Sequence, residues 1–300
     1  MPFTVVVVLH DSAAELAVLL RSIDAHLDAR PQLVAVDSGS RDGGAALAAE
    51  WGAEVLELPD NPGFGASSNA GVERARHDVC VLLNPDCELL DGSLTALAKL
   101  ARVHPHALHA ARLLNADGSV QRSAHPLPGT LGTVAGAALH PPLLPGPLRE
   151  RLEPFRAERA RTVGWATAAC LAGETAALRS LGPFDPAAHL FAEDMDLCLR
   201  ARKAGMPTVL HPQLRVRHSG GHATLRGGEP FDLLARRRRA VVAAARGPRA
   251  AGLDDLAQGI TLGSRAAGHA LLGGDARRPR RQLAALIRAR RSEPARPTRR

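Results

Sequence analysis

The sequence has no tyrosine, three methionines and only 3% aromatic residues. No apolar run reaches the roughly 18–20 residues that a membrane-spanning helix needs. The run from Val5 to Leu9 is short and bounded by polar residues, which predicts a strand rather than the core of a signal peptide. The four cysteines, at positions 80, 87, 170 and 198, lack the spacing of a metal site. We therefore expect no membrane-spanning segment, mostly buried thiols and a cytoplasmic location.

Positive charge gathers at the C-terminal end, although 45% hydrophobic and 23% charged residues are typical of a globular protein. The net charge is +8, and much of the excess lies in Arg236–Arg239 and in residues 277–300. A basic tail of this kind either binds an anionic partner or is solvated and partly disordered. No aromatic residues alternate with the arginines, so base stacking and a nucleic-acid partner are not expected. Peripheral contact with the inner face of the cell membrane remains open.

The N-terminal part alternates between strand-like and helix-like segments. The expected strands are 3–9, 33–36, 55–58 and 79–83, and the expected helices are 14–27, 43–51, 66–75 and 94–103. This alternation predicts an α/β fold with a mostly parallel, doubly wound sheet flanked by helices.

The remainder is less regular. A proline- and glycine-rich loop is expected at 126–147, helices at 148–161, 174–181 and 193–204, and strands from 163, at 209–210 and at 214–216. We expect one domain over 1–229, with a nucleotide-binding half of about 1–115 and an acceptor-side half of about 116–229. A helical, Arg-rich extension would occupy 230–300.

Two polar residues follow the expected strand at 79–83. Asn84 and Asp86 are two positions apart, so in an extended segment their side chains point the same way. Open α/β sheets bind ligands at the carboxyl ends of their strands. A carboxylate with an amide suits a hard divalent cation that also holds a diphosphate. Alternatively, Asp86 is only a turn former or a helix cap.

Further polar residues follow the second and third expected strands. Asp37 precedes Ser38 and a glycine, where an acid can accept hydrogen bonds from a ribose or a base edge, or simply cap a turn. The Gly-rich segment Asn61–Gly65 leads into a helix, which is typical of a nucleotide phosphate site. It partly matches the dinucleotide fingerprint, but that fingerprint belongs after the first strand, so a dehydrogenase is disfavoured.

Three acids open the expected helix at 193–204. Helix capping explains one or two of them, so Glu193 or Asp194 is a candidate general base, while Asp196 is expected to make a structural contact. His218 follows a short strand and precedes glycines. It is either a metal ligand or a structural histidine.

These segments together resemble the family 2 glycosyltransferases, and within them the rhamnosyltransferase-like branch. The resemblance covers roughly residues 3–222, and each motif is loose while their order and spacing are specific. The motifs are VVVVLHDS (5–12), VDSGSRDG (36–43), NPGFG (61–65), LNPD (83–86), DGSVQRS (117–123), GPFD (182–185), FAEDMDLC (191–198) with Arg200, and His218.

The resemblance implies a GT-A fold, a nucleotide-diphosphate sugar donor, a divalent metal (Mn²⁺ or Mg²⁺) and inversion at the anomeric carbon. Asp86 and His218 would bind the metal, and Asp194 would be the catalytic base with Glu193 beside it. The substrate-binding positions would be Asp11, Asp37, Ser38, Asn61, Gly63, Gly65, Asn69 and Asn84. The sequence departs from the usual family pattern at His10, Ser38 and Ala168.

We therefore expect an inverting, metal-dependent glycosyltransferase. It would move a sugar, rhamnose by branch resemblance, to a hydroxyl of a lipid-linked or polysaccharide acceptor. One alternative is a catalytically degenerate nucleotide-sugar-binding module. A nucleotide-sugar pyrophosphorylase would want a Gly-rich loop with basic residues after the first strand, which residues 10–14 do not supply.

Overall fold

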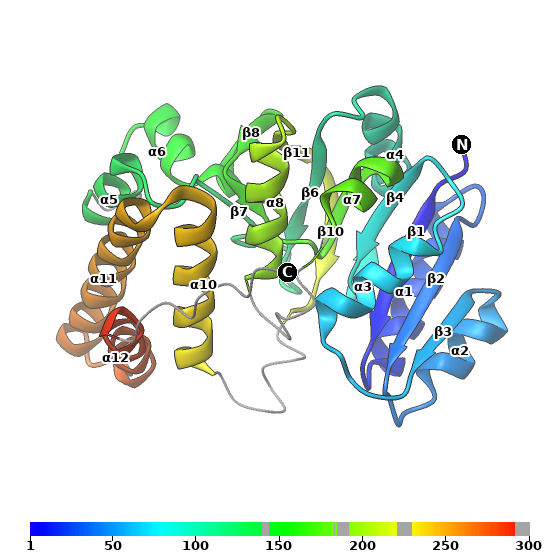
Figure 1. Ribbon diagram of the computed structural model, residues 1–300, viewed down its shortest axis with the longest axis horizontal. Coiled ribbons are helices and arrows are strands. Elements are labelled where there is room, and N and C mark those ends of the chain that lie inside the picture. The colour runs from blue at the N-terminus through cyan, green and yellow to red at the C-terminus, as the bar shows by residue number, and fades with distance from the viewer. Residues whose placement is uncertain (140–143, 183, 185–191, 221–229, 292–300) are drawn as a thin grey trace. The chain divides into compact units, whose positions relative to one another are not determined.

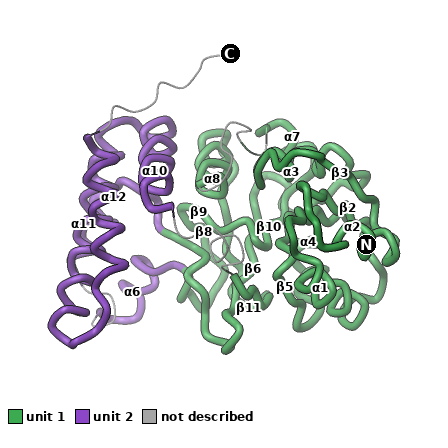
Figure 2. The backbone as a smooth tube through the Cα atoms, turned by 90° about the horizontal axis from the view of Figure 1, so that it is seen from below, with its two compact units in different colours: residues 1–125, 155–222 green, residues 126–154, 223–300 purple. Residues whose placement is uncertain are grey.

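The computed structural model describes residues 1–139, 144–182, 184, 192–220 and 230–291 (Figure 1). The chain forms two compact units (Figure 2). Unit 1 comprises residues 1–125 and 155–222, and unit 2 comprises residues 126–154 and 223–300. Residues 126–154, which the sequence suggested as part of the acceptor-side half, thus group with the C-terminal helices.

Unit 1 is built on a nine-stranded sheet with the order β3-β2-β1-β4-β10-β6-β11-β5, in which β8 also pairs with β11. Strands β1 to β4 are mutually parallel where they pair, β6 is parallel to β11, and β10, β5 and β8 pair antiparallel to their neighbours. The sheet strands are β1 (Thr4–Leu9), β2 (Gln32–Ser38), β3 (Glu54–Leu58), β4 (Val79–Leu83), β5 (Cys87–Leu89), β6 (Leu108–Leu114), β8 (Arg161–Val163), β10 (Cys170–Glu174) and β11 (Thr208–His218). A separate two-stranded sheet pairs β7 (Ala124–His125) with β9 (Trp165–Ala166).

Helices cover both faces of the large sheet, as Figure 1 shows. Because side chains alternate along a strand, Val5 and Val7 pack into one core with α1 and α4, while Val6 packs into the other with α3, α7 and α8. This explains the continuous apolar run of β1, since both of its faces are buried. The helices of unit 1 are α1 (Ala13–His26), α2 (Gly44–Trp51), α3 (Phe64–Glu73), α4 (Ser93–Val103), α7 (Thr175–Leu181) and α8 (Glu193–Lys203).

The expected elements of the first 103 residues are confirmed within a few positions, whereas several later ones are wrong. The expected loop at 126–147 contains helix α5 (Leu131–Ala138), which begins with a capping box between Thr130 and Thr133. The expected helix at 148–161 is the shorter α6 (Gly146–Leu152), followed by a 3₁₀ turn (Pro154–Arg156). The two short strands expected at 209–216 are one strand, β11, with a register shift between His211 and Arg215.

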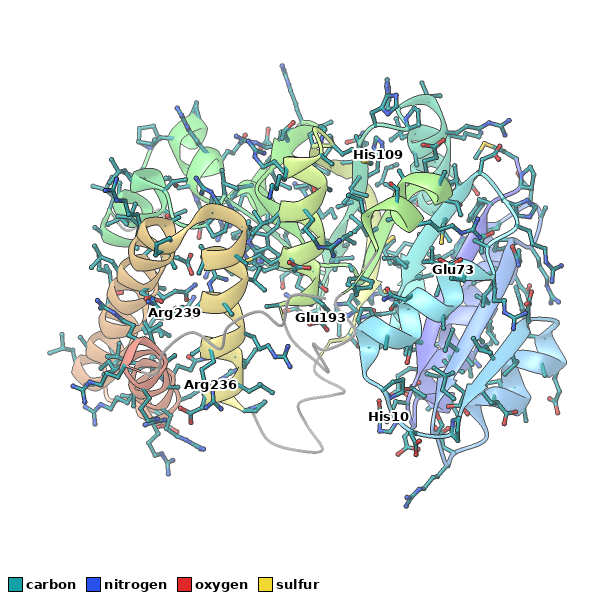
Figure 3. All side chains as sticks on the ribbon, in the orientation of Figure 1. His10, Glu73, His109, Glu193, Arg236 and Arg239 are labelled. Atoms are coloured by element: carbon teal, nitrogen blue, oxygen red, sulfur yellow. The ribbon has the colours of Figure 1, made fainter. Side chains whose placement is uncertain are left out.

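Unit 2 is helical and consists of α5, α6, α10 (Phe231–Arg246), α11 (Pro248–Leu271) and α12 (Arg277–Arg291). Two arginines of α10 form ion pairs with almost fully buried acids of α11: Arg238 with Asp254 at 2.7 Å, and Arg239 with Asp255. Figure 3 labels Arg239 on α10. None of the described helices, including the 24-residue α11, has an apolar stretch sufficient to cross a bilayer.

Candidate active site

The turn after β4 brings Asp86 beside the end of β11. Strand β5 begins directly after Asp86, and its antiparallel pairing with β11 sets Cys87 opposite His218. The Asp86 Oδ1 atom lies 3.2 Å from His218 Nε2. Its Oδ2 atom accepts a 2.9 Å hydrogen bond from the Gly220 amide. Gly220 adopts a left-handed φ of 67°, a backbone conformation that favours glycine.

Asn84 joins the same cluster. Its backbone N–H donates to the Ala169 carbonyl at 3.0 Å, and its Nδ2 atom lies 3.3 Å from His218 Nε2. The Asn84 Oδ1 atom is buried and has no hydrogen-bond partner within the described part of the chain. An orphaned carbonyl oxygen is costly unless a ligand satisfies it, so this atom indicates a place for a cation or a polar substrate group.

The donor set fits a hard divalent cation. Octahedral Mg²⁺ binds ligands at about 2.0–2.1 Å, so neighbouring ligand atoms lie about 3 Å apart. The 3.2 Å between Asp86 Oδ1 and His218 Nε2 matches that spacing. Among the described residues no three His, Cys, Asp or Glu side chains form a closed metal cage. A partial set of this kind leaves coordination positions for the oxygens of a diphosphate.

The Asp86 carboxylate is held in its charged form. Burial by itself raises the pKa of this group, but the His218 hydrogen bond and charge, together with the Gly220 amide, outweigh burial and lower the pKa below its ordinary value. A carboxylate that stays ionised is the form that binds a cation.

Helix α8 contributes the acids at its N-terminal end, where Figure 3 labels Glu193. The side chain of Glu193 is buried, and Ala192 just before it has a left-handed φ of 65°. Asp196 forms a 2.7 Å ion pair with Arg200 one turn later, the structural contact that the sequence suggested.

The carboxyl group of Asp194 has a strongly shifted pKa. Burial raises its pKa from the ordinary 3.8 to about 6, although a hydrogen bond from the Ala168 amide and the charge of His218 oppose that rise. Asp194 is therefore near His218 in space. A carboxyl group with a pKa close to the working pH is suited to general-base chemistry.

A second polar network lies at and after the C-terminal ends of β2 and β3. The Ser38 hydroxyl donates to Asn61 Oδ1 at 3.0 Å and accepts from Ser67 at 3.1 Å. The Gly63 amide also donates to Asn61 Oδ1, at 3.0 Å. The Asp37 carboxylate is buried and accepts from the Ser40 amide at 2.9 Å. These bonds fix the loops that follow β2 and β3.

The other expected substrate positions have varied surroundings. Asp11 adopts an unusual φ of 48° and accepts from the Arg41 amide at 2.8 Å, which ties the loops after β1 and β2 together. Gly63 has a φ of 92° just before α3, and Gly65 is buried within that helix. Both polar atoms of the Asn69 amide bond the Phe184 backbone, at 2.8 and 2.9 Å, so the structure uses this side chain to join α3 to the segment after α7.

The sequence assigned no chemical role to several contributors to the site, although it marked Ala168 as a departure from the family pattern. Ala168 and Ala169 act through backbone atoms, so their side chains carry no signal. Gln121 accepts a hydrogen bond from the His218 ring at 2.9 Å. Gln121 lies in the DGSVQRS motif, which contributed to the family resemblance but was given no functional role.

The fold is that of the GT-A glycosyltransferases. The chain superimposes on the mannosyltransferase of Pyrobaculum calidifontis in complex with GDP-Man and Mn²⁺, with a TM-score of 0.56 and 16% identity over 96% of this chain and 85% of that one. It also superimposes on GalNAc-T7 with UDP, GalNAc and Mn²⁺, with a TM-score of 0.58 and 17% identity, covering 80% of this chain and 47% of that one. At such identities the likeness establishes the fold alone.

The chain belongs to glycosyl transferase family 2, whose family model matches residues 4–177. It is 30% identical over 250 residues to the N-acetylglucosaminyl-diphospho-decaprenol L-rhamnosyltransferase of Mycobacterium tuberculosis, covering 77% of this chain and 80% of that protein. The protein is therefore a glycosyltransferase, as the sequence motifs predicted.

Proposed function

We propose that the protein is an inverting, metal-dependent transferase that moves a sugar from a nucleotide-diphosphate donor to a hydroxyl of a lipid-linked acceptor. The observation that carries the proposal is the convergence of Asp86, His218 and Asp194 from three separate elements, with the Asp194 pKa raised to about 6. A single displacement at the anomeric carbon is assisted by a cation that neutralises charge on the leaving diphosphate. It is also assisted by a general base whose pKa lies near the working pH.

Asp86, His218 and Asn84 would hold the metal. When bound, Mn²⁺ or Mg²⁺ neutralises charge on the leaving diphosphate. Asp86 contributes a carboxylate kept ionised by its neighbours, and Asn84 contributes its unsatisfied oxygen. Because a diphosphate is itself a multidentate oxygen ligand, a partial protein set favours the donor-bound state.

Asp194 would act as the base. Its carboxylate takes the proton from the acceptor hydroxyl as that oxygen bonds to the anomeric carbon. The bond from that carbon to the diphosphate oxygen breaks, and its electron pair leaves with the diphosphate. Glu193 is next in the chain and buried, so it would orient the acceptor hydroxyl. No covalent enzyme intermediate is needed, which accounts for inversion.

The donor and acceptor assignments rest on the curated relative. That protein is named as an L-rhamnosyltransferase whose acceptor carries N-acetylglucosaminyl diphosphate on decaprenol. We infer that rhamnose is the donor sugar here and that the acceptor sugar is carried on a lipid diphosphate. Asp37 and the loop Asn61–Gly65, with Ser38, Asp11 and Asn69, would line or brace the nucleoside subsite.

Donor binding tests the metal assignment. Calorimetry with nucleoside diphosphates should show binding to the wild-type protein that strengthens with Mn²⁺. Asp86→Ala should lose the metal-dependent part, whereas Asp28→Ala, the same change at an exposed acid, should retain it. Equal affinity of Asp86→Ala and wild type with Mn²⁺ present would contradict the assignment. Metal-dependent binding without turnover of any sugar donor would support the degenerate binding module instead.

Unit 2 offers a basic pocket for lipid phosphates. Helices α10 and α12 form an open pocket of about 560 Å³, lined by Pro230, Phe231, Asp232, Leu233, Arg236, Arg281, Ala284 and Arg288. Figure 3 labels Arg236 on α10. The Arg281 guanidinium lies 5.5 Å from the Phe231 ring centre, and Arg288 pairs with Asp232 at 2.7 Å. Guanidinium groups beside apolar side chains suit phosphates at an anionic lipid surface.

We propose that this pocket provides peripheral membrane contact. Each basic residue near an anionic surface contributes about 1 kcal/mol, so Arg281→Ala should lower binding about fivefold to vesicles of mixed phosphatidylglycerol and phosphatidylcholine. Arg249→Ala removes an exposed arginine of unit 2 that does not line the pocket, and should have a smaller effect in the same sedimentation assay. Equal losses for both variants would refute the pocket as the contact.

A further inference from the structure

The DGSVQRS motif forms a tight hairpin after β6. The main-chain N–H of Asn115 donates to the main-chain carbonyl of Ser119 at 2.8 Å. The Asp117 carboxylate accepts from the Ser119 amide at 2.9 Å and from its hydroxyl at 2.6 Å. Gly118 takes a left-handed φ of 81° in the turn. The hairpin reverses the chain, so that the main-chain N–H of Gln121 donates to the main-chain carbonyl of Leu113 at 2.9 Å.

The hairpin aims the side chain of Gln121 at His218. Its Nε2 atom donates to Asn115 Oδ1 at 3.1 Å and to the His218 main-chain carbonyl at 3.4 Å. A main-chain carbonyl can only accept a hydrogen bond. The amide of Gln121 is therefore oriented with its NH₂ group toward these two acceptors and its oxygen toward the imidazole.

That orientation decides which ring nitrogen of His218 carries the proton. Gln121 Oε1 lies 2.9 Å from His218 Nδ1. An amide oxygen has no proton to give, so Nδ1 must be the donor. With Nδ1 protonated, a hydrogen bond from Nε2 to Asp86 needs the doubly protonated, charged ring, and that is the form that lowers the Asp86 pKa. In the neutral ring, Nε2 instead has a lone pair and no proton. It is Nε2 that faces Asp86 Oδ1 and Asn84 Nδ2, at 3.2 and 3.3 Å.

We propose that Gln121, held by Asn115, is a positioning residue that keeps His218 protonated at Nδ1 and so leaves the Nε2 lone pair available to a divalent cation. The competing tautomer, with the proton on Nε2, would donate to Asp86 and close the cation position. The role in metal binding rests on the proposed function, whereas the tautomer is a property of the metal-free protein.

The tautomer can be read directly by ¹⁵N NMR of histidine-labelled protein without metal. At about pH 8.5, well above the ordinary histidine pKa of about 6.5, the shifts distinguish protonated from bare ring nitrogens. The resonances of His218 are identified by their loss in His218→Asn. We expect Nδ1 to be protonated in the wild type, and a mixture or the Nε2-protonated form in Gln121→Met.

Two further variants separate positioning from folding. Gln121→Glu keeps an oxygen acceptor for Nδ1 and should retain the wild-type tautomer. Val120→Ala changes an exposed neighbour in the same hairpin and should leave both tautomer and metal affinity unchanged. Mn²⁺ affinity, measured by calorimetry, should fall about 10–100-fold in Gln121→Met, as is typical when the partner of a ligating histidine is lost.

The outcomes are distinguishable. An Nε2-protonated His218 in the wild type, or an unchanged tautomer in Gln121→Met, would overturn the proposal. If the tautomer responds as expected and neither protein binds Mn²⁺, the positioning role of Gln121 stands and the metal-dependent function fails. If the His218 tautomer and the Mn²⁺ affinity both change in Gln121→Met, Gln121 of the DGSVQRS motif positions His218 for metal binding.

Discussion

Replacing Asp194 with asparagine should stabilise the protein while abolishing sugar transfer. Burial raises the pKa of this carboxyl from 3.8 to about 6, which means that the folded state disfavours its charged form. A pKa change of this size corresponds to about 3 kcal/mol, and partial exposure of the side chain reduces it to about 1–2 kcal/mol. The neutral amide avoids that cost and can still accept the hydrogen bond from Ala168.

The pH dependence follows from the sign of the change. Because the folded-state pKa is raised, the folded protein binds more protons than the unfolded chain between about pH 4 and 6. The wild type therefore loses stability through this group as pH rises across that window. The stabilisation by Asp194→Asn should be full above about pH 6 and absent below about pH 4.

Urea unfolding at pH 4, 5, 6 and 7.5 measures this directly, with Asp196→Asn as the matched control. Asp196 is two positions away and its carboxylate pairs with Arg200, so its replacement should destabilise rather than stabilise. Transfer by the wild type, measured as kcat/KM, should fall about tenfold for each pH unit below 6. An Asp194→Asn variant that transfers sugar near the wild-type rate, or that is less stable at pH 7.5, would refute this reasoning.

Three further substitutions test interactions within unit 1 or within unit 2. Gly71→Ala should destabilise unit 1 by about 1–3 kcal/mol, because an added Cβ would lie 2.4 Å from a methyl of Val6; an unchanged urea midpoint would contradict this. His211 is buried with His109 Nδ1 at 2.9 Å from its Nε2, and burial with the neighbouring histidines lowers its pKa to about 4. The unfolded chain then binds more protons between about pH 4 and 6.5, so unfolding free energy should fall as pH drops through that window, by up to about 3 kcal/mol, and His211→Gln should flatten the dependence. Asp254→Ala should cost about 1–3 kcal/mol because it removes a buried carboxylate that pairs with the partly exposed Arg238 of α10; thermal unfolding that matches wild type would refute it.

The sequence predicted elements where local patterns and burial agree. The β-branched run of β1 and the leucine spacing of α1 carry their own signals, and both elements lie where expected. Strand β6 was missed because it includes His109 and Arg112 among its apolar residues. Helix α5 was missed because proline and glycine surround it, and it packs on α11, which is distant in the chain.

Some features of the candidate site were also readable from the sequence, and others needed the structure. Residue types and their spacing were enough to select Asp86, Asp194 and His218 and to suggest the family, because carboxylates and imidazoles have limited chemistry and the motifs keep a fixed order. Only the tertiary structure decided that Asp194 has a raised pKa and that Gln121 meets His218. Burial and hydrogen-bond geometry depend on which segments pack together through space, and one-dimensional spacing does not record that.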